Sequence, residues 1–151
     1  MKKTILCILV MTLVLALLTG CGKKALEPQS FVEELLSGAR FTDSLNPLDA
    51  PVIPIIYEVD EGDYTDAIVY CGTAATGEEI AVFTAKDDAS AERLLKAAQT
   101  RVDNLVESYK SYGPEAARTL ENSVVARSGS YVVVVVCSDS AGAKKICDKY
   151  I

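Results

Sequence analysis

The sequence contains no histidine and no tryptophan. The lack of histidine excludes Ser-His-Asp and Cys-His nucleophiles, HExxH zinc sites and zinc ions held by three histidines. Basic residues are also few, 15 against 21 acidic ones, and the net charge of −6 disfavours nucleic acid, which binds basic surfaces. Half of the residues are hydrophobic, so the chain is not of the disordered class, and its 151 residues suit one domain.

The beginning of the chain has the pattern of an export signal. A short basic start precedes a run from Ile5 to Leu18 that is apolar at every position but one. The run has 14 residues, whereas a membrane-spanning helix needs about 20. We therefore predict a signal peptide over residues 1–20, with cleavage between Gly20 and Cys21.

The end of this segment, Leu18-Thr19-Gly20-Cys21, resembles the lipobox of bacterial lipoproteins. The resemblance implies that the nucleophilic Cys21 thiol takes a diacylglyceryl group, and that acyl chains such as palmitate then anchor the mature chain in the membrane. A plain secretory signal with an unrelated cysteine and an uncleaved anchor are the alternatives. Cleavage would remove two lysines and leave 131 residues with a net charge of −8. Lys23 and Lys24 then lie either beside anionic headgroups or in a solvated tether.

The mature region is expected to consist of a lipidated tether over residues 21–29 and one domain over residues 30–151. Ser30 and Glu33 fit a capping box and predict a helix from Phe31 to Ser37. Proline-rich chain follows, in which residues 53–59 are expected as a strand or extended segment at a sheet edge. The remaining pattern predicts strands over residues 67–71, 78–85, 123–127 and 131–137, a long apolar-striped helix after Asp87, a short helix over residues 115–121 and a last helix after Ser140.

Five consecutive valines, Val132 to Val136, predict a strand that is buried on both faces at the centre of the sheet. The short turn over residues 128–130 predicts that this strand forms a hairpin with the one before it. The order of elements indicates an α+β fold: a single small domain with a mostly antiparallel sheet of four to five strands and helices chiefly on one face.

Several of these segments together are similar to a bacterial family catalogued as domain of unknown function 4358. The features that carry the resemblance include Tyr70, the long helix with Arg101, the turn Gly129-Ser130-Tyr131 and, most specifically, Glu78-Glu79-Ile80-Ala81-Val82-Phe83. The resemblance extends from about residue 30 to the end of the chain. Members of this family are small, often lipobox-bearing proteins, chiefly of Gram-positive gut-type anaerobes. The resemblance implies an extracytoplasmic single domain and brings no activity, cofactor or catalytic residue.

Four carboxylates are the weak site candidates: Asp60 and Asp63 in an acidic turn, and Glu78 and Glu79 at the start of a strand. The acidic turn does not fit the EF-hand pattern for Ca²⁺, so we expect it to be solvated. A glycosidase needs two carboxyls at one substrate, but adjacent strand residues point to opposite faces. Glu78 or Glu79 could act only with Asp60 or Asp63. We expect instead that one of the two glutamates pairs with a lysine or arginine, and we assign no catalytic residue, metal ion or cofactor.

Three cysteines remain in the mature region after Cys21: Cys71, Cys137 and Cys147. An exported domain permits disulfides, and Cys137 and Cys147 lie close enough in sequence to meet. The alternative is that all three are buried as small hydrophobic side chains.

These observations together predict a membrane-anchored extracytoplasmic lipoprotein, on the outer face of the cytoplasmic membrane if the cell is Gram-positive. We expect it to be a non-enzymatic binding or interaction module, whose partners are the membrane lipid through Cys21 and an envelope protein or the cell wall. The alternative is a small cell-envelope glycan hydrolase that uses carboxylates. A solute-binding transporter component is disfavoured because 131 residues scarcely build two lobes.

Overall fold

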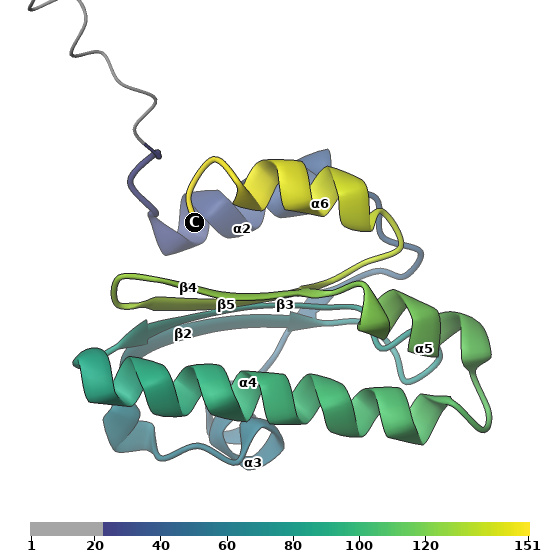
Figure 1. Ribbon diagram of the computed structural model, residues 1–151, viewed down its shortest axis with the longest axis horizontal. Helices are drawn as coiled ribbons and strands as arrows, with labels where there is room; N and C mark the ends of the chain where they lie inside the picture. The colour runs from purple at the N-terminus through teal and green to yellow at the C-terminus, as the bar shows by residue number, and fades with distance from the viewer. Residues whose placement is uncertain (1–22) are drawn as a thin grey trace, which may run out of the picture.

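A computed structural model describes residues 23–151, so the predicted signal peptide and Cys21 lie outside the described residues. One antiparallel sheet lies between two layers of helices (Figure 1), and its strands follow the order β1-β2-β3-β5-β4. The strands are β1 (Asn46–Pro47), β2 (Tyr64–Cys71), β3 (Glu79–Ala85), β4 (Val124–Ser128) and β5 (Tyr131–Val136). The α-helices are α2 (Pro28–Gly38), α3 (Ile53–Tyr57), α4 (Asp88–Tyr109), α5 (Pro114–Glu121) and α6 (Ser140–Cys147).

Strands β3 and β5 form the centre of the sheet, as the run of valines predicted. Ala81 of β3 pairs with Val134 of β5, and Val125 of β4 pairs with Val134 from the other side. All five valines are at most 1 % exposed. Because successive strand residues point to opposite faces, the run divides its side chains between two hydrophobic cores.

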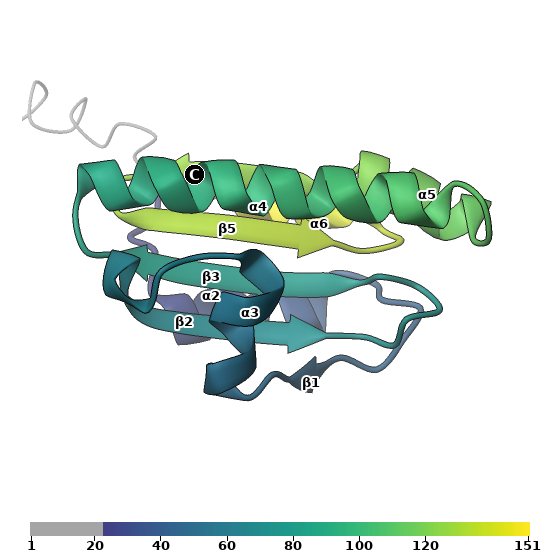
Figure 2. The same ribbon diagram turned by 90° about the horizontal axis from the view of Figure 1, so that it is seen from below.

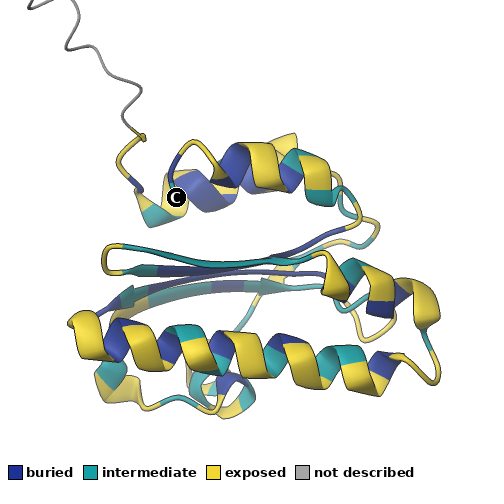
Figure 3. Ribbon diagram, viewed as in Figure 1, coloured by how far each residue is buried: buried dark blue, intermediate teal, exposed yellow. Residues whose placement is uncertain are grey.

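The first core lies beneath α4, with α3 and α5 on the same face of the sheet (Figure 2). Helix α4 begins as expected at Asp87, whose side chain accepts a hydrogen bond from the Ser90 amide. Its apolar stripe includes Leu94, Ala98 and Val102, which are almost fully buried (Figure 3). The greater length of helix therefore covers this face.

The second core lies beneath α2 and α6, on the opposite face. The ring of Phe31 in α2 packs edge-to-face against the ring of Tyr150, with 5.1 Å between the ring centroids. Ile146 and Cys147 of α6 are buried in the same core as Val133 of β5. The α+β class and the antiparallel sheet are thus confirmed, and each face of the sheet has its own helical cover.

Residues 53–57 form a helix, so the prediction of a strand over residues 53–59 is wrong. Pro51 lies in the first turn of the 3₁₀ helix Ala50–Val52, and Pro54 lies in the first turn of α3. Proline suits that position because the amides there have no intrahelical acceptor. The fifth strand is instead β1, where Pro47 is tolerated at the sheet edge.

Helix α2 begins at Pro28, so the predicted capping box at Ser30 is wrong. The Glu27 carboxylate accepts the Ser30 amide at 2.8 Å and serves as the cap, and Pro28 occupies the first turn. Leu26 already lies in the second core, at 8 % exposed. The packed part of the chain therefore begins before residue 30.

Candidate functional site

A buried ion pair joins the sheet to α4. Arg101 donates to Glu79 through Nη2 at 2.6 Å and through Nε at 3.2 Å, and its Nη1 donates to the Ile56 carbonyl at 3.1 Å. The Tyr57 hydroxyl and the Cys71 thiol also donate to the Glu79 carboxylate. This confirms the expectation that one of the two adjacent glutamates is paired with a basic residue.

The buried pair is surrounded by hydrogen-bond donors. Glu79 is 3 % exposed, and its carboxylate oxygens are occupied by four donor groups. Burial disfavours the charged guanidinium of Arg101, but hydrogen bonds and attraction to Glu79 outweigh burial and raise the Arg101 pKa. Burial and the adjacent carboxylate raise the Tyr57 pKa well above its usual value, so the hydroxyl stays protonated and donates to Glu79. The network therefore connects β3 to α3, α4 and the end of β2.

Glu78 points to the other face and fastens a neighbouring segment. Its carboxylate accepts hydrogen bonds from the amides of Thr42, Asp43 and Ser138 at 2.8–3.0 Å. It is only 2 % exposed. The two glutamates thus lie on opposite faces, as predicted, and each is fully used in holding the fold.

Asp60 and Asp63 lie at the other end of β2 from the glutamates. The Asp60 side chain accepts the Gly62 amide, while Asp63 pairs with Arg93 at 2.5 Å, which lowers the Asp63 pKa. Strand β2 pairs with β3 from Tyr64 opposite Ala85 to Cys71 opposite Glu79. The length of the strand therefore separates the aspartates from the glutamates, and the structure does not bring the four candidates together.

A cleft between α3 and α4, which we call the α3–α4 cleft, lies beside the buried pair. Its volume is about 430 Å³, and it is lined by Ile56, Tyr57, Glu58, Arg93, Lys96, Ala97, Thr100, Arg101, Asn104, Leu105 and Ser108. Lys96, Thr100 and Asn104 follow one another at every fourth residue of α4, so they lie along one side of the helix. Within residues 23–151 no hydrogen bond or ion pair engages these three side chains.

Helix α3 and its end have two further unusual features. Ile55, which does not line the cleft, is a large apolar side chain that is 72 % exposed. Glu58 has a φ of 54° at the end of α3, in the left-handed region that side chains with a Cβ rarely adopt. The cleft wall therefore combines a left-handed residue, Glu58, with the exposed polar side chains of Lys96, Thr100 and Asn104.

A smaller cavity of about 210 Å³ shares Arg101 and Leu105 with the cleft. Its other wall is the connection from Gly72 to Gly77, which the Tyr109 hydroxyl holds by donating to the Ala74 carbonyl at 2.6 Å. Gly77 has a φ of 66°, and a Cβ there would contact Tyr109 and Leu120. The connection from Gly72 to Gly77 therefore packs closely against Tyr109 at the end of α4.

Comparison with known families matches residues 40–137 to one family model, described as Domain of unknown function (DUF4358). The chain belongs to this family. Neither the curated proteins nor the solved structures contain a match. The matched region includes both members of the buried pair and all of the residues that line the α3–α4 cleft.

Over the described residues, none of the helices combines the length and the apolar character that crossing a membrane requires. The same part of the chain holds no group of three or more cysteine, aspartate or glutamate residues arranged to bind a metal ion.

Sequence reasoning missed the α3–α4 cleft of the DUF4358 domain because it placed residues 53–59 in a strand. It also did not identify Arg101 and Tyr57 as the partners of Glu79. The available indication was on α4, where Arg101 stands directly between the exposed Thr100 and Val102 of the apolar stripe. Tyr57 precedes Glu79 by 22 residues and Arg101 follows it by 22, so these contacts form only once the chain is folded.

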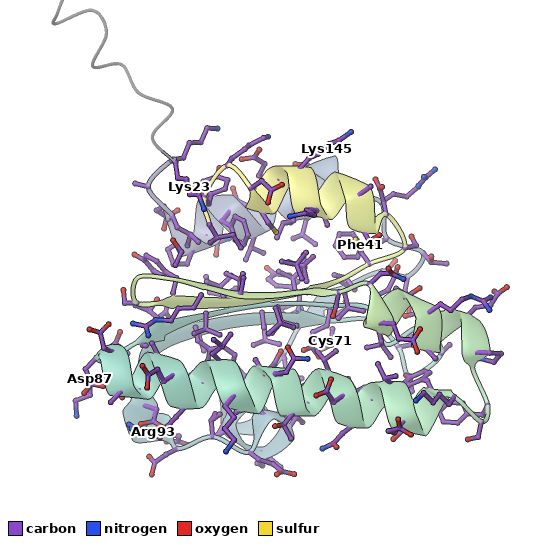
Figure 4. All side chains as sticks on the ribbon, in the orientation of Figure 1. Lys23, Phe41, Cys71, Asp87, Arg93 and Lys145 are labelled. Carbon is purple, nitrogen blue, oxygen red and sulfur yellow. The ribbon has the colours of Figure 1, made fainter. Side chains whose placement is uncertain are left out.

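Cys71, Cys137 and Cys147 are free thiols in the structure. Cys71, labelled in Figure 4, lies between the sheet and α4, whereas Cys137 and Cys147 are buried in the second core. The Cys137–Cys147 bridge considered from the sequence is not formed there.

We predict that these thiols resist alkylation in the folded protein. Burial raises the pKa of Cys71 and Cys147 to about 12 and that of Cys137 to about 11. A higher pKa leaves less of the reactive thiolate, so Cys71 should react with iodoacetamide at pH 8 about a thousandfold more slowly than an ordinary thiol. Mass spectrometry of each cysteine-containing peptide measures this, with guanidinium-unfolded protein as the control. Rapid labelling of native Cys71 would contradict the prediction.

Proposed function

We propose that this protein is a lipid-anchored, extracytoplasmic lipoprotein whose DUF4358 domain is a non-enzymatic binding module of the cell envelope. The anchoring part rests on the apolar run from Ile5 to Leu18 and the lipobox-like end at Cys21. The binding part rests on the α3–α4 cleft.

The observation that carries the binding role is the row of unpartnered polar side chains in the cleft. Lys96, Thr100 and Asn104 face an opening of about 430 Å³ whose other wall includes the apolar Ile56. Such a mixture of apolar wall and convergent polar groups is typical of ligand sites. The buried pair at the side of the cleft, Glu79 with Arg101, is already satisfied and supports the wall without offering a free acid or base.

Changing Cys21 to Ser is expected to abolish anchoring, because a hydroxyl does not replace the thiol that accepts the lipid. The variant should lose lipid-dependent processing and move from the detergent phase to the aqueous phase in a Triton X-114 partition. Cys7→Ser, within the predicted signal, is the matched control and should partition like wild type. Wild-type protein recovered without lipid from the culture medium would refute the anchoring proposal.

Filling the cleft is expected to weaken binding to the envelope. Thr100→Leu introduces a larger apolar side chain into the cleft, whereas Gln99→Leu makes a similar change at an exposed position of α4 outside it. We predict that wild type and Gln99→Leu co-sediment with purified cell-wall sacculi, and that Thr100→Leu does so about tenfold less, equal to the loss of about 1.4 kcal/mol.

The same incubation tests the enzymatic alternative. A binding module leaves the sacculi intact, so the supernatant should contain no more soluble glycan than a blank without protein. Release of glycan fragments that depends on Glu78 or Glu79 would contradict the non-enzymatic proposal. Equal sedimentation of Thr100→Leu and Gln99→Leu would contradict the assignment of the cleft.

A further inference from the structure

The charge of the domain is divided unequally between the segments that form α2 and α6 and the rest of the chain. We define the α2/α6 face as residues 23–40 and 138–151, which contain six basic and five acidic side chains, a net charge of +1. Residues 41–137 contain seven basic and sixteen acidic side chains, a net charge of −9. The remainder of the domain is thus strongly repelled by an anionic surface, whereas the α2/α6 face is not.

The start of the described chain is fixed to this same face. The Lys24 amide donates to the Lys149 carbonyl at 2.7 Å, and the Lys24 ammonium lies over the Tyr150 ring at 5.6 Å. Only three residue steps separate Cys21 from Lys24, and extended chain covers at most about 3.6 Å per residue, so the two lie within about 11 Å of each other. A lipid on Cys21 therefore holds Lys24, and with it the Lys149–Tyr150 end of the α2/α6 face, within about 11 Å of the lipid-bearing residue, close to one Debye length.

The basic groups on this face are placed to use that proximity. Lys23, Lys24, Lys144 and Lys145 are all exposed. Figure 4 shows Lys23 and Lys145 directed away from the sheet on the outer side of α2 and α6, while Arg93 lies on the α4 side. Ion pairs within the α2/α6 face already neutralise part of its acidic charge.

Two ion pairs neutralise two of the carboxylates on the α2/α6 face. Glu34 pairs with Lys149 at 2.5 Å, and Asp148 pairs with Lys144 at 2.9 Å. Glu27 and Glu33 are exposed nearby and oppose the attraction. Within residues 23–151 no ion pair engages Lys23, Lys24 or Lys145, so these three lysines remain to meet an anionic partner.

We propose that the α2/α6 face rests on the anionic phospholipid headgroups of the bilayer that holds Cys21, and that the α3–α4 cleft therefore faces away from the membrane. This inference rests on the lipid anchor proposed above. The short chain supplies the proximity, and the division of charge selects the orientation. Helices α3 and α4, whose residues line the cleft, lie on the opposite side of the sheet from α2 and α6 (Figure 1), so a membrane-bound domain presents the cleft to partners beyond the bilayer.

The test is lysine footprinting of the full chain expressed in a bacterium, purified from membranes and reconstituted into vesicles. Its mass is measured first to establish that it is lipidated. Vesicles of phosphatidylcholine alone are compared with vesicles that also contain phosphatidylglycerol, using a water-soluble acetylating reagent and peptide mass spectrometry. We expect phosphatidylglycerol to slow acetylation of Lys23, Lys24 and Lys145 about threefold or more, an effect that salt removes. Lys96 on α4 and Lys110, directly after its end, should be unchanged.

Two charge-matched variants sharpen the result. Lys144→Glu/Lys145→Glu should lose the protection of Lys23 and Lys24, whereas Lys86→Glu/Lys110→Glu, with the same change in net charge, should keep it. A lipidated chain whose lysines are protected equally on both faces, or without dependence on phosphatidylglycerol, overturns the orientation and leaves the anchor standing. A chain without lipid overturns the anchor and this inference with it.

Discussion

Val134→Asp is expected to unfold the domain. Val134 is 0 % exposed on the middle of β5, between Ala81 of β3 and Val125 of β4, and its side chain faces the core beneath α4. The introduced carboxylate would have no cation or hydrogen-bond donor there, so it must either remain an unpaired charge or become protonated at a high cost. The loss should be at least about 3–5 kcal/mol, a large part of the 5–15 kcal/mol that stabilises a typical domain.

Urea unfolding followed by circular dichroism measures this loss. Thr65→Asp is the matched control, because Thr65 is an exposed residue of β2 and a carboxylate there stays in water. We expect the control to change the free energy of unfolding by less than about 0.5 kcal/mol. A Val134→Asp protein with the melting temperature of wild type would show that β5 is not the central strand.

Arg101→Leu is expected to have the second largest effect, because it leaves the Glu79 carboxylate buried without its cation. Removing one member of a buried ion pair typically costs about 3–5 kcal/mol. Some of the hydrogen bonding to Glu79 remains, since the Tyr57 hydroxyl and the Cys71 thiol still donate. The expected loss is therefore about 3 kcal/mol in the free energy of unfolding.

A double-mutant cycle separates the ion pair from packing. Glu79→Leu/Arg101→Leu removes both charges, so it should be more stable than Arg101→Leu alone, even though the Tyr57 hydroxyl loses its acceptor. Additive effects of the two single changes would mean that the pair does not act as a unit. Arg93→Leu provides a comparison, since Arg93 has 57 % of its side chain exposed and pairs with Asp63 at the surface. It should cost less than about 1 kcal/mol.

The elements that sequence reasoning predicted are those whose pattern repeats. Helix α4 has a long apolar stripe and an acidic cap at Asp87, and β5 has an unbroken run of valines, so neither depends on distant partners for its identity. The opposite orientation of Glu78 and Glu79 likewise follows from strand geometry alone. These features could therefore be predicted from local rules.

The features that were missed depend on contacts between distant segments. The sequence of α3, Ile53–Tyr57, is as apolar as a strand, and only its packing against α4 makes a five-residue helix stable. The cap of α2 was missed because Glu27 competes with Ser30 for the same role. The partners of Glu79 come from α3 and α4, and the α3–α4 cleft exists only once those two helices meet.

The central claim is that the domain acts while held at a membrane by Cys21, and the intact mass of the native protein tests it most directly. The full chain is expressed in a bacterium, extracted from the membrane fraction with detergent and measured by mass spectrometry, with fragmentation of its N-terminal peptide. We predict a chain that begins at Cys21 and carries a diacylglyceryl group on that residue. A chain that begins elsewhere, or an unmodified Cys21, would contradict the account.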